Sequence, residues 1–157
     1  IDPEIKSNTN YRLASVLVVI YDHSPKIIMT EKPQSMKFHA GEISFPGGKF
    51  DVNDSNLLET ALRETSEEIG LDVSKNQVIG QLAPVTTLNS GFLILPFVSI
   101  LDKIPPLMAN SEVEKISIQS QKSIRKNRFY KFNKRFHHNR FYKISAKIYI
   151  YHCQNNK

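Results

Sequence analysis

The chain contains a single cysteine, Cys153, among its 157 residues. One thiol cannot form an internal disulfide, so the sequence is unlike a disulfide-stapled secreted domain and fits a reducing compartment. We interpret Cys153 as a bystander. No secretory signal peptide is apparent, and we therefore predict a cytoplasmic location or another reducing compartment. The chain begins with Ile1 rather than methionine, which leaves its natural start open.

The sequence also lacks a long apolar run. The two longest, residues 13–20 and 92–101, are well short of the roughly 20 residues that a membrane-spanning helix needs, and Pro96 interrupts the second. We therefore predict no membrane partner. With 40% hydrophobic and 23% charged residues, the composition is that of an ordinary soluble protein, and the length suits one domain with its own core.

Acidic residues are scarce near the C-terminus. Residues 111–157 hold 12 Lys/Arg against 2 Asp/Glu, whereas residues 1–110 hold 9 against 13, so the formal charge of +6 combines parts of +10 and −4. Aromatic residues interleave with the basic ones, which is a pattern of nucleic-acid binding. We favour a solvated lysine-rich surface over that interpretation. A divergent or altered C-terminus would have the same composition.

The densest acidic segment has the spacing R-E-x-x-E-E-x-G, formed by Arg63, Glu64, Glu67, Glu68 and Gly70. On a helix that turns roughly 100° per residue, the three glutamates share one narrow face. Like charges at these spacings repel, so the face calls for a compensating cation. Mg²⁺ and Mn²⁺ prefer carboxylate oxygens. The alternative for such a spacing is a solvated acidic helix face.

The predicted helix has signals for packing and for both of its ends. Asp54 or Ser55 is the expected N-terminal cap, and Gly70 is the expected C-terminal stop. The arc beside the glutamates should anchor the helix on a core. Its members are Leu58, Ala61, Leu62, Thr65 and Ile69.

Together with the upstream glycine pair, this segment resembles the signature of the Nudix hydrolases, G-x5-E-x7-R-E-U-x-E-E-x-G-U, where U is a bulky aliphatic residue. Gly48 takes the position of the first glycine, and Leu71 that of the last aliphatic residue. Two positions depart from the signature. The upstream acidic residue is Asp54, one residue further from Arg63 than in the signature, and Thr65 replaces an aliphatic residue.

Residues 28–48 resemble a second motif, which marks the coenzyme A diphosphatase branch of that family: L-L-T-x-R-S-x-x-L-R-x-H-x-G-x-x-x-F-P-G-G. Lys32, Met36 and Lys37 stand for its first arginine, leucine and second arginine. The two motifs occur in order at compatible spacing, and the resemblance covers about two thirds of the chain. The direct matches are Thr30, His39, Gly41, Phe45, Pro46, Gly47 and Gly48.

The resemblance implies an α/β fold, the Nudix α/β/α sandwich with a mixed β-sheet. Residues 1–157 are expected to form a single domain, with 1–10 as a candidate for disorder and 115–157 as an atypical basic segment. Residues 141–151 read either as a strand or, from Tyr142, as the family's closing helix. Apolar runs and alternation predict further strands at residues 13–20, 26–30, 42–45, 77–86, 92–101 and 113–119. A tight turn is expected at residues 46–48.

The resemblance also implies the roles of the site residues. Glu64, Glu67 and Glu68, with the backbone of Gly48, would hold Mg²⁺ or Mn²⁺. Glu67 and Glu64 are the candidates for activating water, and Arg63 is expected to orient the carboxylates. Asp54 is interpreted as a helix cap, with an outer-shell metal contact as the alternative.

Three further residues are candidates for binding substrate phosphates: Lys32, Lys37 and His39. A surface lysine or a loop histidine is the ordinary alternative for each of them. Glu112 follows a proline-containing loop, where the family often has an E-V pair, and is an additional candidate for reaching the metal site.

The implied reaction is attack by a metal-activated water on a diphosphate linkage. Coenzyme A or an acyl derivative would give 3′,5′-ADP and 4′-phosphopantetheine. ADP-ribose, a dinucleotide or an RNA 5′ end are alternative substrates. A non-catalytic nucleotide- or nucleic-acid-binding module is an alternative of another class, but it would not need three retained glutamates. The oligomeric state stays open.

Overall fold

The computed structural model describes residues 11–36, 40–87 and 90–120. These residues belong to one compact unit that ends at Ser120. The predictions for residues 1–10 and for the basic segment beyond Ser120, including the strand or helix at 141–151, lie outside the described residues. Lys37 and His39 lie outside them as well.

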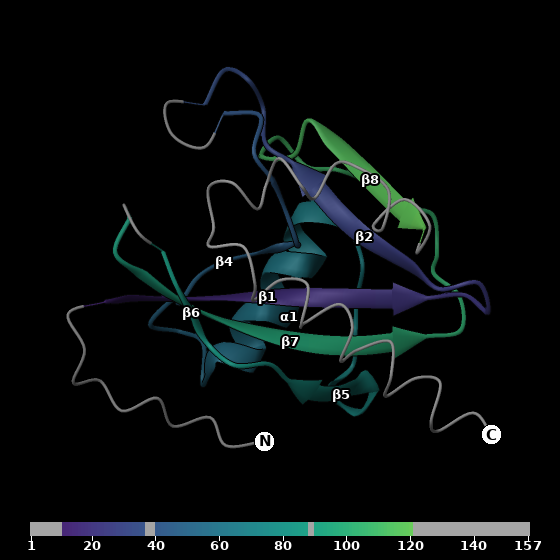
Figure 1. The fold of residues 1–157 in the computed structure, drawn as a ribbon, viewed down its shortest axis with the longest axis horizontal. Helices are drawn as coiled ribbons and strands as arrows, with labels where there is room; N and C mark the ends of the chain where they lie inside the picture. The colour runs from purple at the N-terminus through teal and green to yellow at the C-terminus, as the bar shows by residue number, and fades with distance from the viewer. Residues whose placement is uncertain (1–10, 37–39, 88–89, 121–157) are drawn as a thin grey trace. The chain divides into compact units, whose positions relative to one another are not determined.

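Within the described residues, eight strands form one mixed sheet with the path β3-β2-β1-β7-β5 (Figure 1). The two long central strands, β1 (Arg12–Tyr21) and β7 (Phe92–Leu101), run parallel along their whole length. All other described pairings are antiparallel. The remaining strands are β2 (Lys26–Glu31), β3 (Ile43–Ser44), β4 (Gly47–Lys49), β5 (Val78–Gln81), β6 (Val85–Thr86) and β8 (Lys115–Ser120).

The centre of the sheet is covered on both faces. Consecutive residues of β1 from Leu17 to Tyr21 are all buried, and successive side chains of a strand point to opposite faces. The near-continuous apolar run of this segment, with its β-branched residues, is therefore the pattern of a strand with no solvated face. This confirms the strand expected at residues 13–20, which the structure extends by one residue at each end.

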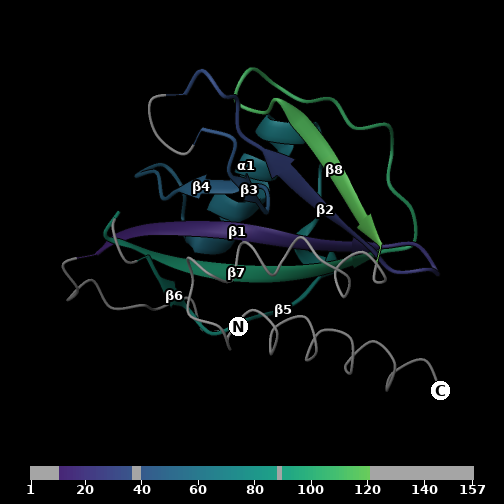
Figure 2. The ribbon, with the colours of Figure 1, turned by 45° about the horizontal axis from the view of Figure 1, so that its top comes forward.

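The single helix longer than one turn in the described part of the chain, α1 (Leu57–Ile69), packs against the sheet. In Figure 1 it lies behind the sheet and crosses β1 and β7, and Figure 2 shows the same layering after a turn about the horizontal axis. The predicted stop is confirmed, because Gly70 adopts the left-handed conformation and donates its backbone N–H to Ser66 O. None of the described helices is long and apolar enough to cross a membrane.

Two local predictions were wrong. Residues 77–86 do not form one strand: a short 3₁₀ helix, η1 (Lys75–Gln77), precedes β5, and residues 82–84 separate β5 from β6. Pro84 has no N–H to donate to a sheet ladder, and it lies in the break between β5 and β6. The glycine pair is also not a simple turn, because Gly47 and Gly48 belong to β4.

Strand β1 changes its partner along its length, and this change positions the site. Its end, Ile20 and Tyr21, pairs with β2, whereas Ala14, Ser15 and Val16 pair with β4. Strands β2 and β1 therefore diverge (Figure 1), and β4 contacts both β1 and α1. The acidic face of α1 thus meets a strand made of two glycines and a lysine.

Candidate functional site

Glu68 is buried, with 2% of its side chain exposed. The Gly47 N–H donates to its Oε2 at 3.1 Å, and the Lys32 ammonium donates to its Oε1 at 2.6 Å. A buried carboxylate is costly unless it is paired and hydrogen-bonded, and both oxygens of Glu68 meet that requirement. This glutamate is therefore not part of a solvated acidic face, although its sequence spacing alone allows that interpretation.

Glu64 lies directly against the glycine strand, with 18% of its side chain exposed. A Cβ atom added to Gly48 would lie 2.5 Å and 2.6 Å from the two carboxylate oxygens of Glu64. Only glycine leaves room for this approach. Burial raises the pKa of Glu64, the Arg63 guanidinium lowers it in part, and the charges of Glu68 and Glu67 add to the rise.

Glu67 is the most exposed of the three glutamates, with 56% of its side chain in solvent. Its Oε2 accepts a hydrogen bond from Arg63 Nη1 at 3.0 Å. The three carboxylates of the signature therefore occupy three environments, namely buried, half-buried and exposed. Because Glu67 is the most exposed of the three, it can change its hydrogen-bond partners most easily.

Arg63 links Glu64 and Glu67, the two less buried glutamates, to Asp54. Its Nε and Nη2 donate to the two carboxylate oxygens of Asp54 at 2.9 Å and 3.0 Å, and its Nη2 lies 3.1 Å from Glu64 Oε1. A planar guanidinium bound through two parallel hydrogen bonds has little freedom to reorient. This geometry agrees with an orienting role for Arg63.

Asp54 is not the helix cap. The cap is Asn56, whose side chain accepts from Glu59 N, so the expectation for Asp54 or Ser55 was wrong by one or two residues. Asp54 accepts instead from Arg63 and, at 2.8 Å, from Thr60 Oγ1. Asn56 is itself a favoured capping residue, and the sequence offered this signal.

The hydrogen bond from Arg63 is the largest cause that lowers the pKa of Asp54 from 3.8 to about 2. A pKa that is lower in the folded state means that the carboxylate stabilises the fold at pH values above its unfolded pKa. That contribution is lost as the pH falls from about 4 to about 2. At about 1.4 kcal/mol per pKa unit, it amounts to about 2 kcal/mol for this buried carboxylate.

We expect Asp54→Asn to lower the free energy of unfolding at pH 7 by about 2–4 kcal/mol, because it leaves Arg63 without its main partner. The difference from wild type should shrink as the pH approaches 2. Urea unfolding at several pH values measures both effects. Asp22→Asn is the matched control, since Asp22 forms an exposed pair with Lys26, and its effect should stay below about 1 kcal/mol. Equal effects of the two variants at pH 7 would contradict the structural role of Asp54.

Lys32 and Glu112 complete the cluster. Lys32 Nζ lies 3.6 Å from Glu112 Oε2, and the Glu112 side chain is 62% exposed. The structure thus brings Glu112 to the edge of the site, where it contacts Lys32. Lys32 was a candidate for binding substrate phosphate, but its ion pair with Glu68 was not foreseen, because the two residues are 36 positions apart in sequence.

The donor set fits a hard divalent cation, because every candidate ligand is an oxygen. The two glycines let α1 approach β4 so closely that Glu64 and Glu68 both contact this strand. Over residues 11–36, 40–87 and 90–120, however, no three acidic, histidine or cysteine side chains converge on one point that could hold a metal ion. Lys32 and Arg63 are instead the cations that neutralise the carboxylates.

Fold and site together define an α/β protein in which a glutamate-rich helix faces a glycine strand of a mixed sheet. The family model of the NUDIX domain matches residues 11–140. The chain therefore belongs to the Nudix family, which confirms the family to which the sequence motifs pointed.

Curated relatives carry the same family name. A protein of Photorhabdus laumondii subsp. laumondii, described as the uncharacterized Nudix hydrolase NudL, is 37% identical over 115 residues, which are 73% of this chain and 61% of that protein. A Yersinia pestis protein of the same description is also 37% identical, over 68% of this chain and 53% of its own length. The chain thus spans less than two thirds of these relatives.

Solved structures share the fold. The C. elegans Ap4A hydrolase binary complex has a TM-score of 0.65 at 14% identity and covers 90% of this chain and 98% of its own. A bifunctional NMN adenylyltransferase/ADP ribose pyrophosphatase of Francisella tularensis, complexed with AMP and a Mn ion, has a TM-score of 0.56 at 14% identity. It covers 76% of this chain and 37% of its own. These similarities confirm the predicted Nudix α/β fold.

Proposed function

We propose that this chain is a divalent-metal-dependent hydrolase that cleaves the diphosphate linkage of a nucleotide substrate. The observation that carries the proposal is the set of three glutamates on α1, which are buried to different degrees and face a strand whose two glycines leave room for Glu64 and Glu68. A helix face kept only for solubility would not bury Glu68 and pair it with a lysine. The C. elegans neighbour is named as an Ap4A hydrolase, and the F. tularensis neighbour is a complex with AMP and Mn.

Glu64, Glu67, Glu68 and the Gly48 backbone would hold Mg²⁺ or Mn²⁺. When bound, such an ion makes water a stronger nucleophile at neutral pH and neutralises charge on the diphosphate. Other residues of the site hold the carboxylates in position. Gly47 holds Glu68 in place by its N–H, and Arg63 orients Glu64 and Glu67 while its own orientation is held by Asp54.

Glu67 is the candidate for accepting the proton of the attacking water. Its carboxylate is the most exposed of the three and has one described hydrogen-bond partner, Arg63, so it can turn toward a substrate without breaking a buried contact. A base must lie within hydrogen-bond reach of the proton it accepts, and contacts often tighten only when substrate binds. Glu64 is the second candidate, since burial raises its pKa.

The favoured substrate is coenzyme A or an acyl derivative, cleaved to 3′,5′-ADP and 4′-phosphopantetheine. Its support is the second motif, which spans β2 to β4. Lys32 directly follows β2, and hydrogen bonds from Lys32 N to Glu42 O and from Gly41 N to Lys32 O close the loop at its base. This loop therefore starts beside Glu68, which makes Lys32 a candidate for contacting the diphosphate. Lys37 and His39 belong to the same loop in sequence and remain candidates for binding substrate phosphates, including the 3′-phosphate.

A substrate panel tests the proposal. The full chain is incubated with Mg²⁺ or Mn²⁺ and with coenzyme A, dephospho-coenzyme A, ADP-ribose, Ap4A or a capped RNA, and the products are separated by chromatography. We expect metal-dependent release of 3′,5′-ADP from coenzyme A, at a higher kcat/KM than for the other compounds. Preference for ADP-ribose, Ap4A or the RNA would retain the hydrolase and replace its substrate. Binding of nucleotides without turnover of any would favour the non-catalytic module.

A further inference from the structure

The ion pair between Lys32 and Glu68 occupies a carboxylate that the proposed function assigns to the metal. At 2.6 Å it is a short contact, and its two side chains are 18% and 2% exposed. Lys32 comes from the segment after β2 and Glu68 from α1, so tertiary packing alone brings them together. The backbone of Lys32 is fixed on both sides by its hydrogen bonds to Gly41 and Glu42. The ammonium can therefore move only through rotation of its side chain.

Both oxygens of Glu68 are already engaged. Oε2 accepts from Gly47 N, and Oε1 accepts from Lys32 Nζ. A divalent ion bound at Oε1 would lie within a few ångströms of the ammonium. Two cations at such a distance repel strongly, the more so where little water is present to screen them. The ammonium and the ion thus compete for the same carboxylate.

We propose that Lys32 is an internal counter-ion that sets the metal affinity of this site. In the metal-free protein it neutralises Glu68, and a divalent ion must displace it in order to bind. This inference rests on the proposed function, because it concerns the ion that the hydrolysis requires. Removal of the lysine charge therefore tightens metal binding, since competition for one ligand is reciprocal.

Glu112 provides a second position for the displaced ammonium. Its Oε2 is 3.6 Å from Lys32 Nζ and lies on the solvent side of the cluster, in contrast to Glu68. The Lys32 ammonium can turn from the buried carboxylate of Glu68 to the exposed carboxylate of Glu112 and so remain paired with a negative charge. The same movement carries its positive charge toward the outside of the site, where an anionic substrate approaches. Lys32 thereby sets the affinity of the site for the ion and is also a candidate for contacting the diphosphate.

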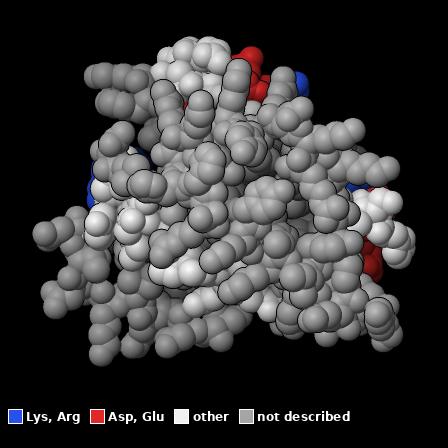
Figure 3. Space-filling view, viewed as in Figure 1, with Lys and Arg blue, Asp and Glu red and all other residues white. Residues whose placement is uncertain are grey.

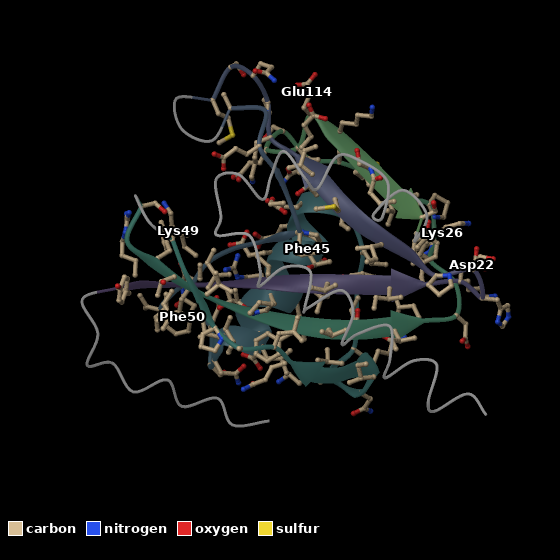
Figure 4. All side chains as sticks on the ribbon, viewed as in Figure 1. Asp22, Lys26, Phe45, Lys49, Phe50 and Glu114 are labelled. Carbon is tan, nitrogen blue, oxygen red and sulfur yellow. The ribbon has the colours of Figure 1, made fainter. Side chains whose placement is uncertain are left out.

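The test compares the Mn²⁺ affinity of wild type, Lys32→Met and Lys32→Arg, measured by electron paramagnetic resonance of free Mn²⁺ and by calorimetry without substrate. We expect Lys32→Met to lower the Kd for Mn²⁺ at least tenfold and Lys32→Arg to keep it within about threefold of wild type. Lys26→Met is the matched control. Figure 4 labels Lys26 beside Asp22, with which it forms an exposed ion pair at the far end of β2 from Lys32.

The outcomes separate the inference from the proposed function. An unchanged or higher Kd for Lys32→Met, with wild type binding Mn²⁺, would overturn the inference and leave the hydrolase standing. Equal tightening in Lys32→Met and Lys32→Arg would also overturn it, because the charge would then not be the cause. If neither wild type nor Lys32→Met binds Mn²⁺, the proposed function fails and the inference fails with it.

A second measurement uses wild-type protein only, so it does not depend on whether a variant folds. NMR spectra of ¹⁵N-labelled wild type detect the lysine ammonium groups whose hydrogens are protected from exchange with water by ion pairs. We expect the Lys32 ammonium signal to change on titration with Mg²⁺ and to saturate at the same concentration as the binding measured by calorimetry. Lys26 is also ion-paired, 2.7 Å from Asp22, and its signal should not change with Mg²⁺. A Lys32 signal unaltered at saturating Mg²⁺ would contradict displacement.

Discussion

Replacing Gly48 with alanine is expected to abolish metal-dependent hydrolysis and to leave the domain folded. The new Cβ would lie 2.5 Å from Glu64 Oε1, well inside contact distance. Glu64 can yield, because the atoms in the way are the end of a flexible side chain. The cost to stability is then small, but the carboxylate leaves the position at which it would hold the ion. Misplacement by about 1 Å can cost 10²-fold in rate, so a loss of at least that size is expected in kcat/KM.

Gly47→Ala is the matched comparison, one residue earlier in the same strand. Gly47 has a φ of 150°, and an added Cβ would lie 2.6 Å from Val16 Cα in the backbone of β1. Backbone cannot turn aside as a side chain can, and the conformation itself is unfavourable for alanine by about 1–3 kcal/mol. We expect this variant to be strongly destabilised or unfolded.

Urea unfolding, Mn²⁺ binding and kcat/KM distinguish the two glycines. The expected pattern is a folded, inactive Gly48→Ala and an unstable Gly47→Ala. A Gly48→Ala protein that retains most of its activity would remove Glu64 from the set of metal ligands. A Gly47→Ala protein as stable as wild type would show that β4 can move away from β1 at little cost.

Glu68→Gln is expected to reduce kcat/KM by at least about 10³-fold. The amide keeps the shape of the carboxylate, but its single oxygen can accept from only one of the two donors that Glu68 binds, Gly47 N or Lys32 Nζ. It is also a far weaker ligand for a hard divalent ion. Removal of single preorganised electrostatic contacts in enzymes costs about 10²–10³, and a ligand of the ion should cost no less. Loss of the charged pair with Lys32 should also lower the free energy of unfolding by roughly 1–3 kcal/mol.

The measurement is kcat/KM in saturating Mn²⁺, with the Mn²⁺ Kd and the urea midpoint of the same preparation. Glu114→Gln serves as the control, because Glu114 is an exposed acid next to β8 and beside the end of β2 (Figure 4). Its removal should change kcat/KM by less than about twofold. Near-normal activity of Glu68→Gln would remove Glu68 from the set of metal ligands.

The ion pair between Asp22 and Lys26 differs from the buried charges at the site. In Figure 3, acidic and basic side chains reach the surface close together at the right edge of the view, the side on which Figure 4 labels Asp22 and Lys26. That pair is about equally exposed on both partners, 38% and 39%. Exposed pairs contribute little to stability. The contrast with the buried Glu68 is the reason that variants at the site are expected to have the larger effects.

The sequence by itself determined the central strands, the helix and the family. The apolar run of β1, the periodicity of α1 and the stop at Gly70 are local signals, because each depends on residues within a few positions of one another. The R-E-x-x-E-E-x-G spacing is local in the same sense, and it placed three glutamates on one helix. The cap at Asn56 was equally local, and it was missed because two other capping residues precede it in the sequence.

Only the tertiary structure decided what surrounds each of these glutamates. Their spacing places all three on one face of the helix and does not distinguish them. Packing nevertheless buries Glu68, half-buries Glu64 against Gly48 and leaves Glu67 in solvent. The environment of a side chain depends on which distant segment packs over it, and here β4 and the segment after β2 are brought to α1 by the change of partner along β1. The pairing of Lys32 with Glu68 follows from the same cause. It joins residues whose positions in the sequence carry no mutual signal, so it could be seen only once the chain was folded.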